Sequence, residues 1–290
     1  MIPARFEYHA PSTLRQAVTI VRSYGGEARV LAGGMSLVPM MKLRLANLAA
    51  VVDLGRIEGL AGIEHTAGGG LVIGPMTTHY QIESSDVVQR VAPVLAEAAS
   101  RVGDVQVRNR GTIGGSVAHA DPAADLAAAL LVLEATFSIV GGPLRRSVRA
   151  DKMFVDAYTS ALDEGEIIAD VRIPLPAPRS GWSYKKIANN ASRFAVVGIA
   201  VLLSSEENGI CTRARVAVTG AGPVPVRARA SEQFLIRKEL TPSNIAKAAA
   251  RAAAGIEFLG DHHASPEYRE HLTEEITKRA LTEACRRINA

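Results

Sequence analysis

Two glycine-rich segments constrain the fold of this chain more than any other feature. The first reads Ala-Gly-Gly-Met-Ser-Leu over residues 32–37, and the second reads Arg-Gly-Thr-Ile-Gly-Gly-Ser over residues 110–116. Without bulky side chains, a backbone can approach a ligand closely and present its N–H groups to it. One such segment could be a tight corner. Two of them, each interrupting an apolar stretch and each carrying a hydroxyl residue, predict a pair of turns that close on a diphosphate.

The better-known nucleotide motifs are absent from the sequence. No Gly-x-Gly-x-x-Gly follows a strand and opens a helix, which argues against the dinucleotide fingerprint. No Gly-x-x-x-x-Gly-Lys-Ser/Thr occurs, which argues against a phosphate loop for ATP or GTP. The hydroxyls of Ser36, Thr112 and Ser116 could donate to a phosphate or could cap their own turns.

Composition describes an ordinary globular chain with room for two domains. Its 290 residues are 48% hydrophobic and 21% charged. The longest apolar stretch, residues 126–133, is far too short to span a bilayer, so no transmembrane segment is expected. The first six residues lack the layout of a secretory signal, and we expect a cytoplasmic protein.

Charge and cysteine content exclude several classes of function. The formal charge is 33 minus 29, or +4, and the basic residues are scattered, so nucleic-acid binding is not expected. Cys211 and Cys285 are the only cysteines, too few for an iron–sulfur cluster or a cysteine zinc site within this chain. Both are expected to be reduced and buried. His119 and Asp121 lack a third partner and are not expected to bind a metal.

Local patterns predict alternating helices and strands. A capped helix is expected from Ser12 or Thr13 to about Gly25, and a second over 85–99 despite Pro93. The alanine-rich stretch at 123–133 is expected to be a buried helix. Two C-terminal helices are expected to begin at the Thr-Pro pair 241–242 and the Ser-Pro pair 265–266. Short strands are expected over 28–31, 51–54 and 71–73, a β-hairpin over 135–148, and an antiparallel sheet from 183–187, 195–203 and 212–219. This order of elements predicts an α+β protein.

The glycine segments and their neighbours resemble a known family. Residues 32–44, Ala-Gly-Gly-Met-Ser-Leu-Val-Pro-Met-Met-Lys-Leu-Arg, resemble the first flavin-binding signature of the medium subunits of molybdenum hydroxylases. Residues 106–116, continued by Ala-His-Ala-Asp-Pro at 118–122, resemble the second. The named relatives are the medium subunit of aerobic carbon monoxide dehydrogenase and the FAD domain of xanthine dehydrogenase. Met35 departs from the family, which usually places His, Gln or Thr there.

The resemblance covers nearly the whole chain and implies a division into two domains. Residues 1–176 would form an FAD-binding domain of the vanillyl-alcohol-oxidase (PCMH) type, with lobes of about 1–55 and 56–176. Residues 177–290 would form a smaller domain of antiparallel sheet and helices, of the carbon monoxide dehydrogenase flavoprotein type. The Pro-rich stretch at 174–178 is the linker that the sequence offers, and the flavin would lie in the cleft between the parts.

The resemblance also implies the residues that contact the cofactor, and none of them is catalytic in the sense of activating a substrate. Asp125 would accept hydrogen bonds from ribityl or ribose hydroxyls, because a carboxylate would be repelled by the diphosphate; an acid at a helix start also needs no ligand. Lys186, in a Tyr-x-Lys pattern, and Phe194 would lie near the isoalloxazine, and Leu162 would pack on the ring. The full cofactor-binding set is Leu31, Ala32, Gly33, Gly34, Met35, Ser36, Leu37, Gly111, Thr112, Ile113, Gly114, Gly115, Ser116, Asp125, Leu162, Lys186 and Phe194.

These observations lead to an FAD-binding electron-transfer subunit of a molybdenum hydroxylase, an oxidoreductase component. Iron–sulfur clusters and molybdopterin are expected only in partners, a small and a large subunit, which would assemble with this chain into a dimer of heterotrimers. Two alternatives stay open. A stand-alone FAD-dependent reductase of related fold would need a catalytic acid of its own, and a flavin-free assembly scaffold is slightly favoured by Met35.

Overall fold

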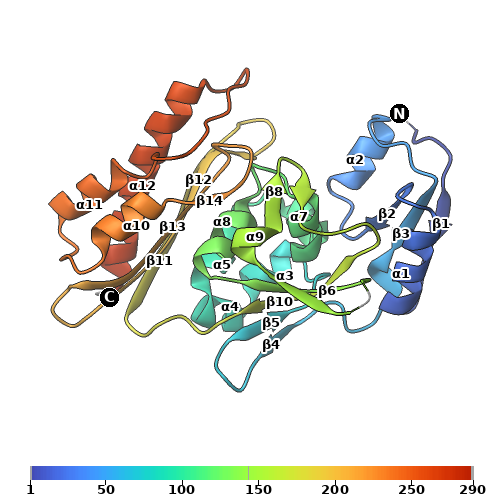
Figure 1. Cartoon of the computed structure of the whole chain (residues 1–290), viewed down its shortest axis with the longest axis horizontal. Helices are drawn as coiled ribbons and strands as arrows, with labels where there is room; N and C mark the ends of the chain where they lie inside the picture. Colours follow the sequence, from blue (N-terminus) through green and yellow to red (C-terminus); the bar gives the residue numbers. More distant parts are fainter. Residues whose placement is uncertain (1, 143, 289–290) are drawn as a thin grey trace.

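Four β-sheets organise the described part of the chain, and the three larger ones follow one another along its longest dimension (Figure 1). The computed structural model describes residues 2–142 and 144–288. A small N-terminal lobe is followed by a central sheet with its helices, and a four-stranded sheet with three helices forms the C-terminal end. This mixture of helices and mainly antiparallel sheets confirms the predicted α+β class.

The N-terminal lobe is built on a three-stranded parallel sheet in the order β1-β3-β2. Helix α1 begins where predicted, because the Thr13 hydroxyl accepts a hydrogen bond from the Gln16 N–H at 3.2 Å. The first glycine segment connects β2 to α2. The elements are β1 (Glu7–His9), α1 (Leu14–Ser23), β2 (Ala28–Leu31), α2 (Leu37–Lys42), β3 (Ala50–Asp53) and the 3-10 helix η1 (Leu54–Arg56).

The central part contains a five-stranded sheet in the order β4-β5-β10-β6-β7. Its strands are β4 (Ile63–His65), β5 (Leu71–Ile73), β6 (Thr136–Val140), β7 (Arg146–Arg149) and β10 (Ile167–Ile173), with a separate pair β8 (Phe154–Asp156) and β9 (Thr159–Ser160). Its helices are α3 (His79–Ser84), α4 (Asp86–Val91), α5 (Pro93–Ser100), α6 (Val105–Arg110), α7 (Ile113–His119), α8 (Asp125–Val132) and α9 (Ala150–Met153). Strands β6 and β7 pair antiparallel, which confirms the predicted hairpin.

The single helix predicted over residues 85–99 is wrong. Pro93 ends α4 and begins α5, and Ala92 between them has non-helical angles of φ −136° and ψ 55°. Proline has no N–H to donate and its ring clashes with the carbonyl four residues before it, whereas the first position of a helix tolerates both. The chain therefore bends between the two helices.

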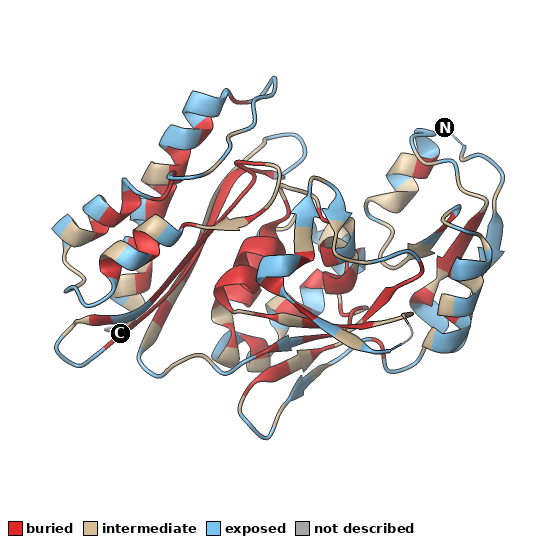
Figure 2. Ribbon diagram, viewed as in Figure 1, coloured by how far each residue is buried: buried red, intermediate tan, exposed pale blue. Residues whose placement is uncertain are grey.

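The C-terminal sheet lies between two layers of helices, which explains its continuously apolar central strand (Figure 2). Helices α10–α12 cover one face, while α5 and α8 contact the other. All eleven residues of β12 are buried, as are all eight of α8, which confirms that the alanine-rich helix is internal. The elements are β11 (Ser180–Ala188), β12 (Ala195–Ser205), β13 (Cys211–Thr219), β14 (Val226–Arg227), α10 (Arg229–Leu235), α11 (Pro242–Ala249) and α12 (Pro266–Ile288).

Both cysteines belong to this C-terminal region and both are free. Cys211 is buried, and burial raises the pKa of its thiol to about 11. Cys285 is only partly buried, so the prediction of two buried cysteines was wrong for one of them. The exposed portion of Cys285 follows from its place on α12, whose other face meets solvent.

Candidate functional site

The two glycine segments lie in direct backbone contact. A Cβ atom placed on Gly33 would lie 2.0 Å from the carbonyl oxygen of Arg110 and 2.8 Å from the Cα of Gly111. Such distances are far below any van der Waals contact, so only glycine fits at position 33. A Cβ on Gly115 would lie 3.5 Å from the Cβ of Ala32. Two segments far apart in sequence therefore form one continuous small-residue surface.

The first segment presents a run of unpaired backbone donors. Within the described chain, none of the N–H groups of residues 32–37 has a hydrogen-bond acceptor. Gly34 has φ +76°, a backbone conformation that favours glycine. Ser36 precedes α2 without capping it through its side chain, and Met35 is 40% exposed. Partly buried N–H groups need acceptors, and a phosphate supplies several oxygens at once. The segment fits the diphosphate of FAD.

The second segment differs from the predicted turn, because most of it is the first part of helix α7. Most of its N–H groups already have acceptors: Ile113 donates to the Thr77 carbonyl at 3.0 Å and Gly114 to the Pro75 carbonyl at 2.9 Å. Gly115 donates to the Thr112 hydroxyl at 3.1 Å, so Thr112 caps the helix. The sequence suggested two backbone cradles. In the structure the free backbone donors belong to the first segment, and the second offers the surface of Gly115 and the hydroxyl of Ser116.

Glycines of the second segment are required by packing against residues 75–79. A Cβ on Gly114 would lie 2.5 Å from the Pro75 Cβ, and a Cβ on Gly111 would lie 2.8 Å from the His79 Cδ2. His79 is 5% exposed, and its Nδ1 has no hydrogen-bond partner within the described chain. Burial, with a smaller contribution from Arg108, lowers the pKa of His79 to about 4. The second segment thus packs against a histidine that is neutral at pH 7.

Asp125 begins helix α8, as predicted, and lies in a buried cluster at the junction of the two parts of the chain. Its Oδ1 accepts a hydrogen bond from the Tyr184 hydroxyl at 2.5 Å, and the Lys186 Nζ donates to its Oδ2 at 2.9 Å. Tyr184 and Lys186 both come from β11. Burial raises the pKa of Asp125 to about 6, while Lys186 and Tyr184 oppose the shift.

Lys186 and Phe194 are brought together by the turn between β11 and β12. The Lys186 Nζ also donates to the carbonyl oxygens of Arg101 and Arg193, each at 2.7 Å. Phe194 follows Arg193 directly and is 45% exposed. Leu162 packs partly buried against the central hydrophobic core, the core that also contains Tyr184. Lys186 and Phe194 therefore lie near the start of α8, whereas Leu162 shares only the central core with Tyr184.

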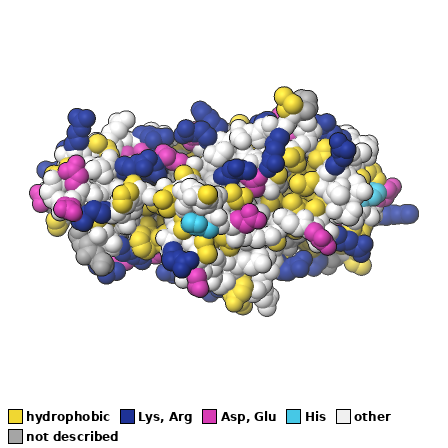
Figure 3. All heavy atoms as spheres, turned by 90° about the horizontal axis from the view of Figure 1, so that it is seen from below, with side chains coloured by type: hydrophobic (Ala, Val, Ile, Leu, Met, Phe, Trp, Pro, Cys, Tyr) yellow, Lys and Arg dark blue, Asp and Glu magenta, His cyan; other side chains and the backbone are white. Residues whose placement is uncertain are grey.

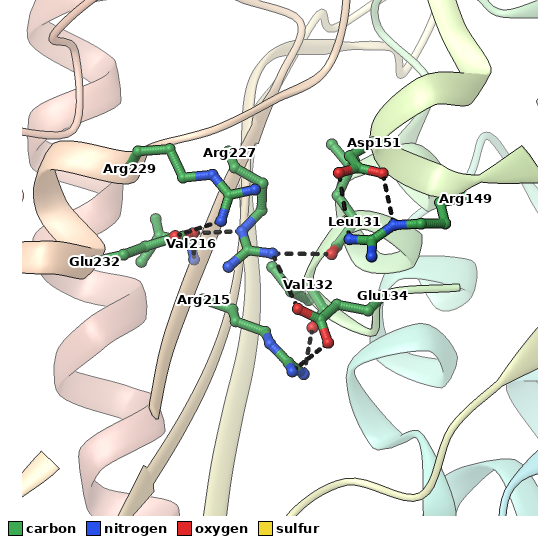
Figure 4. Close-up of polar contacts among 10 residues, drawn as sticks. All are labelled: Leu131, Val132, Glu134, Arg149, Asp151, Arg215, Val216, Arg227, Arg229 and Glu232. Carbon is green, nitrogen blue, oxygen red and sulfur yellow. Dashed lines mark hydrogen bonds and ion pairs between the residues drawn. The ribbon is translucent and has the colours of Figure 1, made fainter. Parts of the chain in front are cut away.

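The opposite end of α8 is held by two arginines of the C-terminal sheet (Figure 4). Glu134 pairs with Arg215 and lies 3.9 Å from the Arg227 Nη1. Arg215 also donates to the Val132 carbonyl at 3.3 Å, so it caps the helix terminus as well. Glu134 has φ +52°, the left-handed conformation that commonly ends a helix. No local sequence pattern indicates this contact, because 81 residues separate Glu134 from Arg215.

The described residues contain no other obvious reaction centre. No group of three His, Cys, Asp or Glu side chains among them could hold a metal ion. None of the helices in the described ranges is long and apolar enough to cross a membrane. On the face seen in Figure 3, Lys and Arg side chains are interspersed with acidic and apolar ones.

Comparison with known protein families identifies both parts of the chain. Residues 4–176 match the FAD binding domain in molybdopterin dehydrogenase, and residues 182–284 match the CO dehydrogenase flavoprotein C-terminal domain. The chain belongs to the family of FAD-binding medium subunits of molybdenum hydroxylases. The resemblance seen in the glycine segments is thereby confirmed, and so is FAD as the cofactor.

Relatives of this family align over nearly their full length. The carbon monoxide dehydrogenase medium chain of Hydrogenophaga pseudoflava is 39% identical over 98% of both chains. The nicotine 6-hydroxylase medium subunit of Paenarthrobacter nicotinovorans is 35% identical, again over 98% of both chains. A solved structure of carbon monoxide dehydrogenase from H. pseudoflava, which lacks the Mo-pyranopterin moiety of the molybdenum cofactor, superimposes with a TM-score of 0.95 at 40% identity over 99% of both chains.

Proposed function

We propose that this medium subunit transfers electrons from the iron–sulfur clusters of a partner subunit to a terminal acceptor. The observation that carries the proposal is the run of unpaired N–H groups at 32–37, in direct contact with the second glycine segment. FAD, when bound, can take electrons singly and release them in pairs. With only two cysteines, both free, this chain holds no cluster of four thiolates.

The residues of the two glycine segments would hold the diphosphate. In this proposal Leu31–Leu37 supply backbone donors and the Ser36 hydroxyl. Residues Gly111–Ser116 supply a close-fitting surface and the Ser116 hydroxyl, while Thr112 holds its helix in place. Met35 does not disturb this arrangement, because the donors are backbone groups.

The residues at the start of α8 would meet the other end of the cofactor. Asp125 would accept from ribityl or ribose hydroxyls, Lys186 would place a positive charge beside the ring, and Leu162 and Phe194 would pack against it. The support is their shared location: Asp125 and Lys186 are paired directly, and the carbonyl next to Phe194 binds Lys186. This location also supports a functional division into residues 1–176, with lobes of about 1–55 and 56–176, and residues 177–290.

We further propose a cytoplasmic assembly with a small iron–sulfur subunit and a large molybdopterin subunit, present as a dimer of heterotrimers. Relatives with similar identity to this chain carry names for carbon monoxide and for nicotine. Such a range of substrates on similar medium subunits supports substrate oxidation on the large subunit. This chain would then supply cofactor binding and electron exit, whichever substrate the assembly oxidises.

The test separates the chain from its partners. The purified chain should carry flavin that is released by denaturation and identified as FAD, not FMN, by chromatography. Under anaerobic conditions dithionite should bleach this flavin, whereas carbon monoxide or nicotine should not. Bleaching by the substrate of the assembly should appear only after the two partner subunits are added. Bleaching by substrate in the isolated chain, or recovery of FMN or of no flavin, would contradict the proposal.

A further inference from the structure

Tyr184 makes one hydrogen bond that nothing in its packing requires. It is fully buried, and its hydroxyl donates to the Asp125 Oδ1 at 2.5 Å. Space for this hydroxyl depends on a glycine in the neighbouring strand, since a Cβ on Gly198 would lie 2.6 Å from the Tyr184 oxygen. Phenylalanine would fill the same volume without the hydroxyl. The structure therefore places a specific donor against the carboxylate, and not merely an aromatic ring.

The carboxylate that receives this bond is shared with Lys186. The Lys186 Nζ lies 2.9 Å from the Asp125 Oδ2, and its remaining donors bind the carbonyls of Arg101 and Arg193. Its side chain is 7% exposed and that of Asp125 is 4% exposed. Three acceptors surround an ammonium that has three N–H groups, so its position is fixed. The charge of this buried pair then depends on whether Asp125 is ionised.

We propose that Tyr184 is a positioning residue for flavin reduction: its hydroxyl holds Asp125 as a carboxylate, which neutralises the Lys186 ammonium beside the flavin ring. The inference rests on the proposed location of Lys186 at the ring. Tyr184 itself touches Asp125 and not the cofactor. Without its hydroxyl, the carboxylate loses a donor and its protonated form gains relative stability. Lys186 then presents an uncompensated positive charge, and the more negative reduced flavin is bound relatively better.

Other charged groups around the cluster do not replace the hydroxyl. Burial, with a small contribution from the nearby Asp121, raises the pKa of Asp125 to about 6, and Lys186 and Tyr184 both oppose this rise. Burial also raises the pKa of Tyr184 well above its usual value, with Arg101 as a partial counterweight. Tyr184 therefore stays protonated at neutral pH and keeps its role as donor. Because burial already raises the pKa of Asp125, the loss of the Tyr184 hydrogen bond shifts the carboxyl further toward its protonated form.

The experiment measures the flavin midpoint potential of the full chain with its FAD bound. At pH 7, Tyr184→Phe should favour the reduced flavin by about tenfold in relative affinity, a rise of about 30 mV for a two-electron couple. At pH 5, where Asp125 is largely protonated in both proteins, the difference should shrink. Ser183→Ala is the matched control, because Ser183 lies on the same strand and its buried hydroxyl has no partner in the described chain. It should leave the potential unchanged at both pH values.

Variants of Asp125 and Lys186 test the other two members of the cluster. Asp125→Asn should raise the potential as Tyr184→Phe does, and the double variant should add nothing, since both changes remove the same negative charge. If Tyr184→Phe does not fold, as judged by its thermal transition, Tyr184→Met, which also lacks the hydroxyl, takes its place. Lys186→Met should lower the potential.

An unchanged potential in Tyr184→Phe, with a shift in Lys186→Met, would overturn the role of Tyr184 alone. An unchanged potential in both, with FAD still bound, would also remove Lys186 from the ring and contradict that part of the proposed function.

Discussion

The contact between the two glycine segments gives a prediction with a magnitude that can be worked from distances. Gly33 has an ordinary φ, so alanine at this position meets a steric problem and not a backbone one. Its Cβ would lie 2.0 Å from the Arg110 carbonyl oxygen, whereas ordinary contact begins at 3.4 Å. The segments must therefore separate by about 1.4 Å, the difference of the two distances.

Such a displacement should be seen in cofactor affinity before it is seen in the fold. A shift of this size is enough to break a hydrogen bond from an N–H of residues 32–37 to a phosphate oxygen, because such bonds are made over a narrow range of distance. A charge-assisted bond contributes about 1.5–3 kcal/mol. Gly33→Ala should therefore weaken FAD binding by roughly 10- to 150-fold. The overpacked contact should also lower the free energy of unfolding by about 1–3 kcal/mol.

The assay is fluorescence titration of the flavin-free full chain with FAD, together with thermal unfolding. Gly68→Ala is the matched control: its φ is also ordinary, and a Cβ there would meet only the Thr66 Oγ1, at 4.0 Å. This variant should leave FAD affinity within about twofold of wild type, since surface changes rarely exceed 0.5 kcal/mol. If Gly33→Ala bound FAD as tightly as the control, the contact between the segments would have no part in holding the cofactor.

Two further predictions concern stability. His79 has a folded-state pKa of about 4 against 6.5 when unfolded, so the unfolded chain takes up its proton first and stability falls as pH drops through this window. His79→Gln should remove about 2 kcal/mol of the loss in unfolding free energy between pH 7 and pH 4.5, measured by urea unfolding at both pH values; an equally steep acid limb would refute it. Glu134→Ala leaves Arg215 and Arg227 without their acidic partner and should lower the free energy of unfolding by about 1–3 kcal/mol. This is less than for a fully buried ion pair, because the Glu134 side chain is 38% exposed. Exposed Glu207 is the control, and equal thermal midpoints for Glu134→Ala and Glu207→Ala would contradict the prediction.

Local signals in the sequence predicted the elements whose causes are local. The hairpin of β6 and β7 follows from the Gly141-Gly142 pair between two short segments that can form strands. Helix α11 begins where Thr241 precedes Pro242, because the Thr241 hydroxyl accepts from the Asn244 N–H at 3.2 Å. In each case the residues that decide the structure lie within a few positions of one another.

Features with distant causes could not be predicted in this way. Gly111-Thr112-Ile113-Gly114 looks like a turn in isolation, since glycine disfavours helix. It becomes the start of a helix because Pro75 and Thr77 accept the N–H groups of Gly114 and Ile113. The bond from Tyr184 to Asp125 spans 59 positions. A local sequence pattern can indicate each of these residues, but it contains no information that the two form a hydrogen bond.

The junction between the two parts of the chain is held through one buried helix. At the start of α8, Thr219 of the C-terminal sheet donates to the Pro122 and Ala124 carbonyls at 2.8 and 3.0 Å, beside the Asp125 cluster. At its end, Arg215 binds Glu134 and the Val132 carbonyl. An apolar helix bonded at both termini to the same sheet has little freedom to slide or tilt against it. The second glycine segment begins α7, the helix that precedes α8, and Lys186 is paired to the first residue of α8. This arrangement would keep the two ends of the proposed flavin site at a fixed separation.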